Sequence, residues 1–119
     1  MVDFHHVNLG VPPDGLDAEM AFLTDVIGYK KLDLTEALRQ IGANWFEAGD
    51  GSQVHLSIDP DHRPAARAHV AVRFGDELSE IETRLLDSGV AFDSFAREGF
   101  PRTLLCRDPA GNHWELRGD

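Results

Sequence analysis

Residues 69 to 74 read HVAVRF and residues 6 to 11 read HVNLGV, two segments that begin with a histidine 63 positions apart. In both, apolar side chains alternate with other residues, which predicts a strand with one buried face. A helical pattern follows each strand and ends at a glycine, Gly28 in one case and Gly89 in the other. The repeated order predicts that the chain contains two copies of one module.

The same elements are expected in the same order in each half: strand, helix, strand, strand, strand. In the first half we expect strands over residues 4–11, 29–34, 44–49 and 52–58 and a helix over 16–27. In the second half we expect strands over residues 69–74, 90–95, 102–108 and 112–118 and a helix over 76–89. This pattern predicts an α+β fold, with one domain over residues 1–119 made of modules 1–60 and 67–119 and a linker that reads DPDHRPAAR.

The composition limits the partners of the protein. Eleven Lys and Arg against 21 Asp and Glu leave a net charge of -10, and no basic run forms a patch for a phosphate backbone. We therefore expect neither nucleic acid nor membrane as a partner. No apolar run approaches the roughly 18 residues of a membrane span, and the first residues lack the features of a signal peptide. The single cysteine, Cys106, excludes an internal disulfide and fits the cytoplasm, and we expect it to be buried and free.

Four side chains that can bind a metal lie at equivalent positions of the two modules. His6 and His69 open the first strands at an offset of 63, and His55 and Glu115 lie in the last strands at an offset of 60. In each strand the apolar residues lie on the opposite face. If the modules are related by an approximate two-fold axis, the four side chains converge. Three imidazoles and one carboxylate suit one divalent ion, namely Fe, Mn, Ni, Co or Zn, because these metals favour nitrogen and oxygen ligands.

The other three histidines are expected to be surface or packing residues. His5 falls on the apolar side of its strand, His62 lies in the linker, and His113 begins the last strand. Within the site, His55 has two alternative roles. Three ligands already suffice for a catalytic metal, so His55 is either the fourth ligand or a general base with an intrinsic pKa near neutrality.

The end of the chain carries the most specific motif. Residues 108 to 116 read DPAGNHWEL and resemble the DP-x-G-x-x-x-E-L close of the vicinal oxygen chelate superfamily. That superfamily includes glyoxalase I, bleomycin-resistance proteins, fosfomycin-resistance transferases, methylmalonyl-CoA epimerases and extradiol dioxygenases. The resemblance covers nearly the whole chain, from residue 4 to residue 118. It implies two βαβββ modules whose curved mixed sheets enclose a cavity and, for chains of this size, a homodimer.

The resemblance also implies roles for the four residues. His6 matches the ligand on the family's first strand, His69 the ligand that opens the second module, and Glu115 the ligand on the last strand. His55 falls where glyoxalase I has a glutamate that is both a ligand and the catalytic base, which is a departure from that enzyme. We therefore expect metal binding from all four residues and catalytic roles for His55 and Glu115.

Residues in phase with these four, together with an aromatic residue on a neighbouring strand, are candidates for substrate contacts. An arginine among them would favour an anionic substrate, because its guanidinium forms forked hydrogen bonds to carboxylate or phosphate. The candidates are Asn8, Trp45, Ser57, Arg73 and Arg117.

Three functions fit these expectations. The first is a metal-dependent lyase, isomerase or ring-cleaving dioxygenase that holds two adjacent oxygens of a small substrate and stabilises the negative charge developing on them. The second is a resistance protein that binds a drug or toxin without turnover. The third is a thiol transferase of the fosfomycin-resistance type. The sequence leaves open the substrate, the native metal, and whether one chain or two chains of a dimer supply the ligands.

Overall fold

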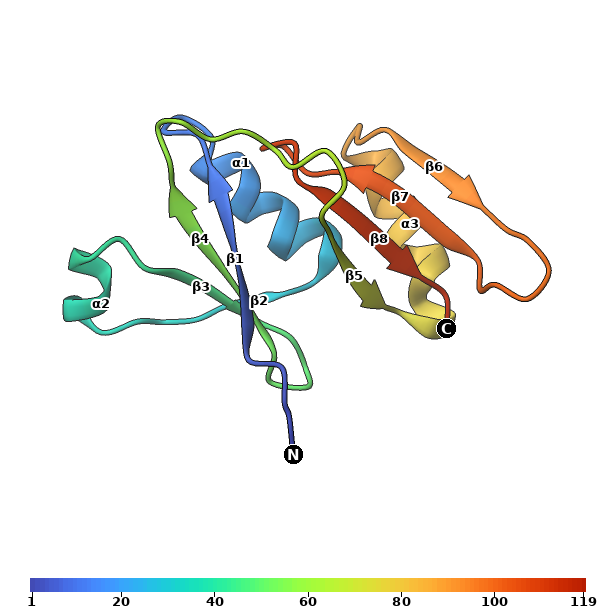
Figure 1. Cartoon of the computed structure of the whole chain (residues 1–119), viewed down its shortest axis with the longest axis horizontal. Coiled ribbons are helices and arrows are strands. Elements are labelled where there is room, and N and C mark those ends of the chain that lie inside the picture. Colours follow the sequence, from blue (N-terminus) through green and yellow to red (C-terminus); the bar gives the residue numbers. More distant parts are fainter. The chain divides into compact units, whose positions relative to one another are not determined.

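The computed structural model describes all residues from Met1 to Asp119 and divides into two compact units, Met1–Arg63 and Pro64–Asp119. Each unit contains one four-stranded sheet and its own helices (Figure 1). No helix combines the length and apolar composition that crossing a bilayer requires.

The first unit is built on strand β1, which pairs in parallel with β4, while β3 and β2 continue the sheet in antiparallel fashion in the order β1-β4-β3-β2. Its elements are β1 His6–Val11, α1 Leu16–Ala21, η1 Phe22–Ile27, β2 Lys30–Lys31, α2 Glu36–Gln40, β3 Asn44–Glu47 and β4 Gln53–Ile58.

The second unit repeats this topology with the order β5-β8-β7-β6, in which β5 and β8 are parallel and the other pairs antiparallel. Its elements are β5 His69–Arg73, η2 Gly75–Glu77, α3 Leu78–Asp87, β6 Phe92–Phe95, β7 Thr103–Arg107 and β8 His113–Arg117. The repeated order of strands and the predicted α+β class with curved mixed sheets are confirmed.

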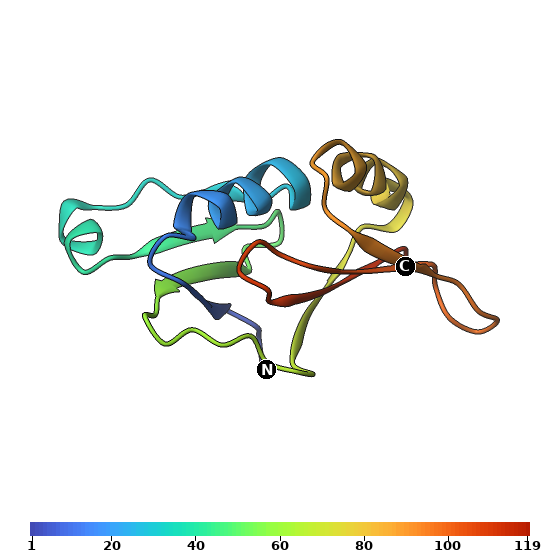
Figure 2. The same cartoon turned by 90° about the horizontal axis from the view of Figure 1, so that it is seen from above.

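In the first unit, helix α1 and its continuation η1 lie over one face of the sheet, and in the second unit helix α3 does the same (Figure 2). In the second unit the apolar spacing of α3 places Leu78, Ile81 and Leu85 inward, and all three are buried on the side of the sheet that carries Trp114 and Leu116. Burial of this apolar surface supplies most of the stabilisation of such a layer. The buried apolar side chains of the first unit are Val11, Phe22, Leu23, Val26, Ile27, Phe46, Val54 and Leu56.

The first helix departs from the predicted pattern in its second half. The segment from Phe22 to Ile27 is a π-helix, and the amide of Gly28 bonds to the carbonyl of Leu23 five residues earlier. Wider turns change which residues face the sheet. In this segment Phe22, Leu23, Val26 and Ile27 are buried. In α1, before it, Glu19 is fully buried, whereas Leu16, which the helical spacing places inward, is only half-buried. Gly28 ends the helix with φ of 102°, a conformation that favours glycine.

Two further differences lie between this helix and β3. The strand expected over residues 29–34 is reduced to Lys30–Lys31, and helix α2 follows where the sequence predicts no element. Thr35 caps α2, because its hydroxyl accepts a hydrogen bond from the amide of Leu38.

Candidate functional site

Each sheet has one face away from its helix, which we call its open face. Residues directly opposite each other on neighbouring strands share a face. Asn8 and Trp45 both lie opposite His55, and in the second unit Ala71 lies opposite Glu115. His55 and Glu115 therefore hold the same place in the two sheets, as their offset in the sequence predicts.

The open face of the first unit carries a stack of three rings. The ring of Trp45 lies 4.3 Å from that of His55 at 8°, and the ring of His6 lies on the other side of His55 at 3.9 Å and 12°. His55 is 9% exposed, which is low for a residue on an uncovered sheet face. The two flanking rings thus hold the plane of the His55 imidazole.

Hydrogen bonding and burial define the state of His55. Its Nε2 lies 2.8 Å from Oε1 of Gln53, two residues earlier on β4. Burial, followed by the nearby imidazoles of His6 and His5, lowers the pKa of His55 to about 4. The ring is therefore neutral at pH 7, which is the form of histidine that binds metals.

His5 does not lie on the apolar side, so that prediction is wrong. It is exposed, its Nδ1 lies 2.8 Å from Nδ1 of His6, and its ring meets the ring of His55 edge-on at 6.4 Å. Strand β1 begins only at His6, so the alternation of the strand does not govern the residue before it. His62, expected to be a surface or packing residue, packs against Gly10, where a Cβ would come within 2.8 Å of its ring.

Two of the predicted substrate contacts bond to each other. The Ser57 hydroxyl donates to Oδ1 of Asn8 at 2.9 Å, which links β4 to β1 on the open face. Trp45 lies on the same face with its ring against His55. The structure thus brings Asn8, Trp45 and Ser57 to the face that carries His6 and His55, and their contact with a substrate stays a prediction.

On the open face of the second unit, His69 faces Glu115. Nδ1 of His69 lies 3.0 Å from the carbonyl oxygen of Arg67, and its Nε2 lies 3.8 Å from Oε1 of Glu115. A carbonyl only accepts, so Nδ1 carries the hydrogen, and in the neutral form of the ring the lone pair is on Nε2. A histidine whose far nitrogen is fixed by a carbonyl is the usual arrangement of a metal ligand.

A chain of charged side chains continues from Glu115. Arg117 donates to Glu115 at 2.8 Å and to Asp119 at 2.9 Å, and Arg73 lies 3.7 Å from Asp119. Both arginines predicted to contact substrate therefore already face carboxylates of the chain. Their predicted role stays untested, and Arg117 now has a second one, since it holds Oε2 of Glu115.

The motif before β8 fixes the position of Glu115. Oδ1 of Asp108 accepts from the amide of Asn112 at 2.8 Å, and Oδ2 accepts from the indole nitrogen of Trp114 at 2.9 Å. Gly111 turns the chain with φ of 85°. Asp108 is 4% exposed, so both bonds form away from solvent. The motif that suggested the superfamily is thus the local structure that anchors β8.

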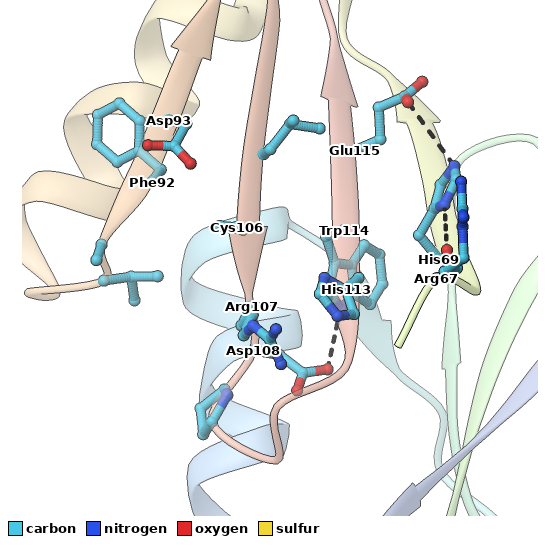
Figure 3. A pocket seen from close by; sticks show the side chains of 14 residues that line it. Arg67, His69, Phe92, Asp93, Cys106, Arg107, Asp108, His113, Trp114 and Glu115 are labelled. Carbon is cyan, nitrogen blue, oxygen red and sulfur yellow. Dashed lines mark hydrogen bonds and ion pairs between the residues drawn. The ribbon is translucent and has the colours of Figure 1, made fainter. Parts of the chain in front are cut away.

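A pocket of about 800 Å³ opens on the second unit, and His69 and Glu115 are among the residues that line it (Figure 3). His113 and Arg107 also line it and lie opposite each other on β8 and β7, and Arg67 borders it beside His69. Nε2 of His113 is enclosed and has no hydrogen-bond partner. His113 was not among the predicted site residues, although its alternation with Glu115 indicates that both lie on this face. Arg67 and Arg107 were not predicted either.

The predicted ligands can be tested for their fit to a metal. Two atoms bound to one ion at about 2.1 Å lie at most about 4.2 Å apart, so the 3.8 Å between His69 Nε2 and Glu115 Oε1 allows both to bind the same ion. No group of three or more His, Cys, Asp or Glu side chains is arranged to hold a metal ion. The predicted set takes two residues from each unit, and it stays a prediction.

Comparison with solved structures identifies the fold. A glyoxalase family protein from Bacillus anthracis is 24% identical, with 98% of this chain and 93% of that chain covered and a TM-score of 0.83. A glyoxalase/dioxygenase from Nostoc punctiforme is 20% identical, with 97% and 89% covered and a TM-score of 0.80. The chain has the vicinal oxygen chelate fold. This confirms, at the level of fold, the resemblance drawn from residues 108 to 116.

The same fold occurs in a genomically encoded fosfomycin resistance protein, FosX, from Listeria monocytogenes. One of its structures is 19% identical to this chain, covers 99% of this chain and 90% of its own, and has a TM-score of 0.78. That protein was solved with Mn(II) and 1S,2S-dihydroxypropylphosphonic acid. No family model and no curated protein matches the sequence. One structural neighbour with this fold thus binds manganese.

Proposed function

We propose that the protein is a divalent-metal-dependent enzyme that acts on a small oxygen-rich substrate. The observation that carries this proposal is the pair formed by His69 and Glu115. Nε2 of His69 faces a carboxylate oxygen at 3.8 Å, and the opposite nitrogen donates to the Arg67 carbonyl. In metal sites the ligands are commonly oriented by hydrogen bonds to neighbouring groups, and both of these side chains have such a bond. Mn(II) in the FosX neighbour adds support.

The ion would be held by His69 and Glu115 of the second unit together with His6 and, as a fourth ligand or a base, His55 of the first. When bound, it would supply a Lewis acid for two adjacent substrate oxygens, which stabilises negative charge on them. The open positions that this chemistry needs remain because at most four side chains are ligands.

The residues around the ligands have roles of their own. Arg117 holds one carboxylate oxygen of Glu115 and so orients the other toward His69. His55 is neutral at pH 7 and so has a lone pair for a metal, but a pKa of about 4 makes it a weaker base than the imidazole with a pKa near neutrality that the sequence led us to expect. The pocket beside His69 would receive the substrate, with Arg67 and Arg107 at its border. We propose a lyase, isomerase or ring-cleaving dioxygenase reaction for this set of residues. We expect a homodimer without nucleic acid or membrane partners.

Metal binding is the first test. Protein purified without a tag is analysed for metal and then titrated with Mn(II), Fe(II), Co(II), Ni(II) and Zn(II) by calorimetry. We expect one ion per chain, with affinity reduced about 100-fold in His69→Ala. His62→Ala is the matched control, since it removes a histidine that packs on Gly10 and is not one of the predicted ligands, and it should bind as wild type does.

Two outcomes would contradict the proposal. If no ion binds, or if His69→Ala binds as tightly as wild type, the metal-dependent reading is wrong. Tight binding of a drug by the metal-free protein, without turnover, would then favour the resistance protein. If metal binds and turnover appears only after a thiol is added, the reaction is a thiol transfer.

A further inference from the structure

The side chain of Gln53 links His55 to a carboxylate that the sequence does not single out. Gln53 opens β4 and lies opposite Glu47 of β3. Its amide nitrogen donates to Oε1 of Glu47 at 3.4 Å, and its amide oxygen lies 2.8 Å from Nε2 of His55. The three side chains therefore form one line of hydrogen bonds along the edge of the ring stack.

Glu47 determines which groups donate and which accept in these hydrogen bonds. An ionised carboxylate can only accept hydrogen bonds, so the NH2 group of Gln53 must face Glu47 and its oxygen must face His55. An amide oxygen also only accepts. The hydrogen between Gln53 and His55 must therefore sit on Nε2 of the imidazole, which leaves Nδ1 with the lone pair.

The ring stack prevents the imidazole from escaping this arrangement. Trp45 covers one side of His55 at 4.3 Å and His6 covers the other at 3.9 Å, with both rings within 12° of parallel. Rotation of the imidazole about its Cβ–Cγ bond would push its edge into one of these rings. The hydrogen bond to Gln53 and the stack thus select one tautomer and one orientation together.

From this geometry we propose that Gln53 is a positioning residue that holds His55 in the tautomer with hydrogen on Nε2, so that Nδ1 is the nitrogen presented to a metal or a proton. The use of Nδ1 rests on the proposed function, whereas the tautomer does not. The second unit does the opposite, because the Arg67 carbonyl binds Nδ1 of His69 and leaves Nε2. The two units would then present opposite nitrogens of their histidines.

The tautomer is read directly in metal-free protein. Nitrogen-15 NMR at pH 7.5, with a chelator present, separates protonated from bare imidazole nitrogens, and the spectrum of His55→Gln identifies the His55 signals. We expect a bare Nδ1 and a protonated Nε2 in wild type. In Gln53→Leu the signals should move toward a mixture of tautomers, and Gln53→Glu should restore them, because its carboxylate also accepts from Nε2. Gln40→Leu on α2 is the matched control and should leave them unchanged.

A hydrogen on Nδ1 of His55 in wild type would overturn the proposal, and this measurement needs no variant to fold. An unchanged tautomer in folded Gln53→Leu would overturn it as well. The second readout is metal affinity, which we expect to fall about tenfold in Gln53→Leu and to recover in Gln53→Glu. If wild type binds no metal while the tautomer is as expected, the proposed function fails and the role of Gln53 in fixing the ring stands.

Discussion

The two units share a strand order and a register but carry different chemistry on their open faces. In the first unit, the aromatic rings of Trp45 and His6 stack on His55, and burial lowers its pKa to about 4. In the second, Glu115 at the equivalent position lies in a chain of ion pairs through Arg117 to Asp119. The register places a side chain, but its neighbours decide whether it is neutral and enclosed or charged and half-exposed.

Replacing the two tryptophans one at a time should give the largest difference in stability between the helix-covered face and the open face. Trp114 is 1% exposed and bonds to Asp108, so Trp114→Ala should lower the free energy of unfolding by about 4 kcal/mol. Trp45 is half-buried on an open face, and Trp45→Ala should cost about 1 kcal/mol. Urea unfolding measures both losses, and amide hydrogen exchange on β3, β4, β7 and β8 locates them. Equal losses would mean that the ring stack is packed like a core.

Alkaline pH should weaken the second unit through Cys106. Burial, followed by the charge of Asp108, raises the pKa of this thiol to about 12. Because the folded pKa lies above the unfolded one, the contribution to stability is complete below pH 9 and is lost as the pH rises toward 12. We expect a loss of about 2 kcal/mol by pH 11, which Cys106→Ala should remove. Tyr29, whose pKa burial raises to about 12, would account for the alkaline loss that remains. An unchanged pH profile in Cys106→Ala would contradict this.

Acid should weaken the first unit through His55, with the opposite sign. The folded pKa of about 4 lies below the ordinary value of 6.5. The unfolded chain therefore binds the proton first, and the contribution to stability is complete above pH 6.5 and lost as the pH falls toward 4. The open face keeps contact with solvent, so we expect about 1 kcal/mol. Unfolding of chelator-treated wild type and His55→Gln between pH 4 and 7 measures it, and parallel profiles would contradict the assignment.

The parts of the fold that the sequence predicts are those set by strand alternation and by the repeat. The offsets of 63 and 60 placed His6 with His69 and His55 with Glu115, and the register agrees with both. Alternation is reliable here because one face of each sheet is covered by a helix and must be apolar. Whether these four residues bind one metal is a separate question, which the register leaves as a prediction.

The parts that the sequence does not predict depend on contacts across strands or outside regular elements. The spacing of the apolar residues signals neither the π-helix over Phe22–Ile27 nor the burial of Glu19 in the turn before it. His5 lies before β1, beyond the reach of its alternation. Gln53 acquires a role only because Glu47 lies opposite it on β3, since that pairing orients its amide. Neighbours across two strands depend on how the strands are aligned, and for β3 and β4 the sequence alone does not give that alignment.

The smallest expected effect tests how much the ion pairs of the second unit contribute. Arg117→Met removes the contacts to Glu115 and Asp119 while keeping an apolar stem of similar length. These side chains are partly exposed, so we expect only a small loss of stability, which largely vanishes in 1 M NaCl. The functional consequence should be larger, because Glu115 loses the group that orients it toward His69. A variant with normal metal affinity would show that Glu115 needs no such support, and the contrast between the ring stack and the ion-pair chain would then concern stability alone.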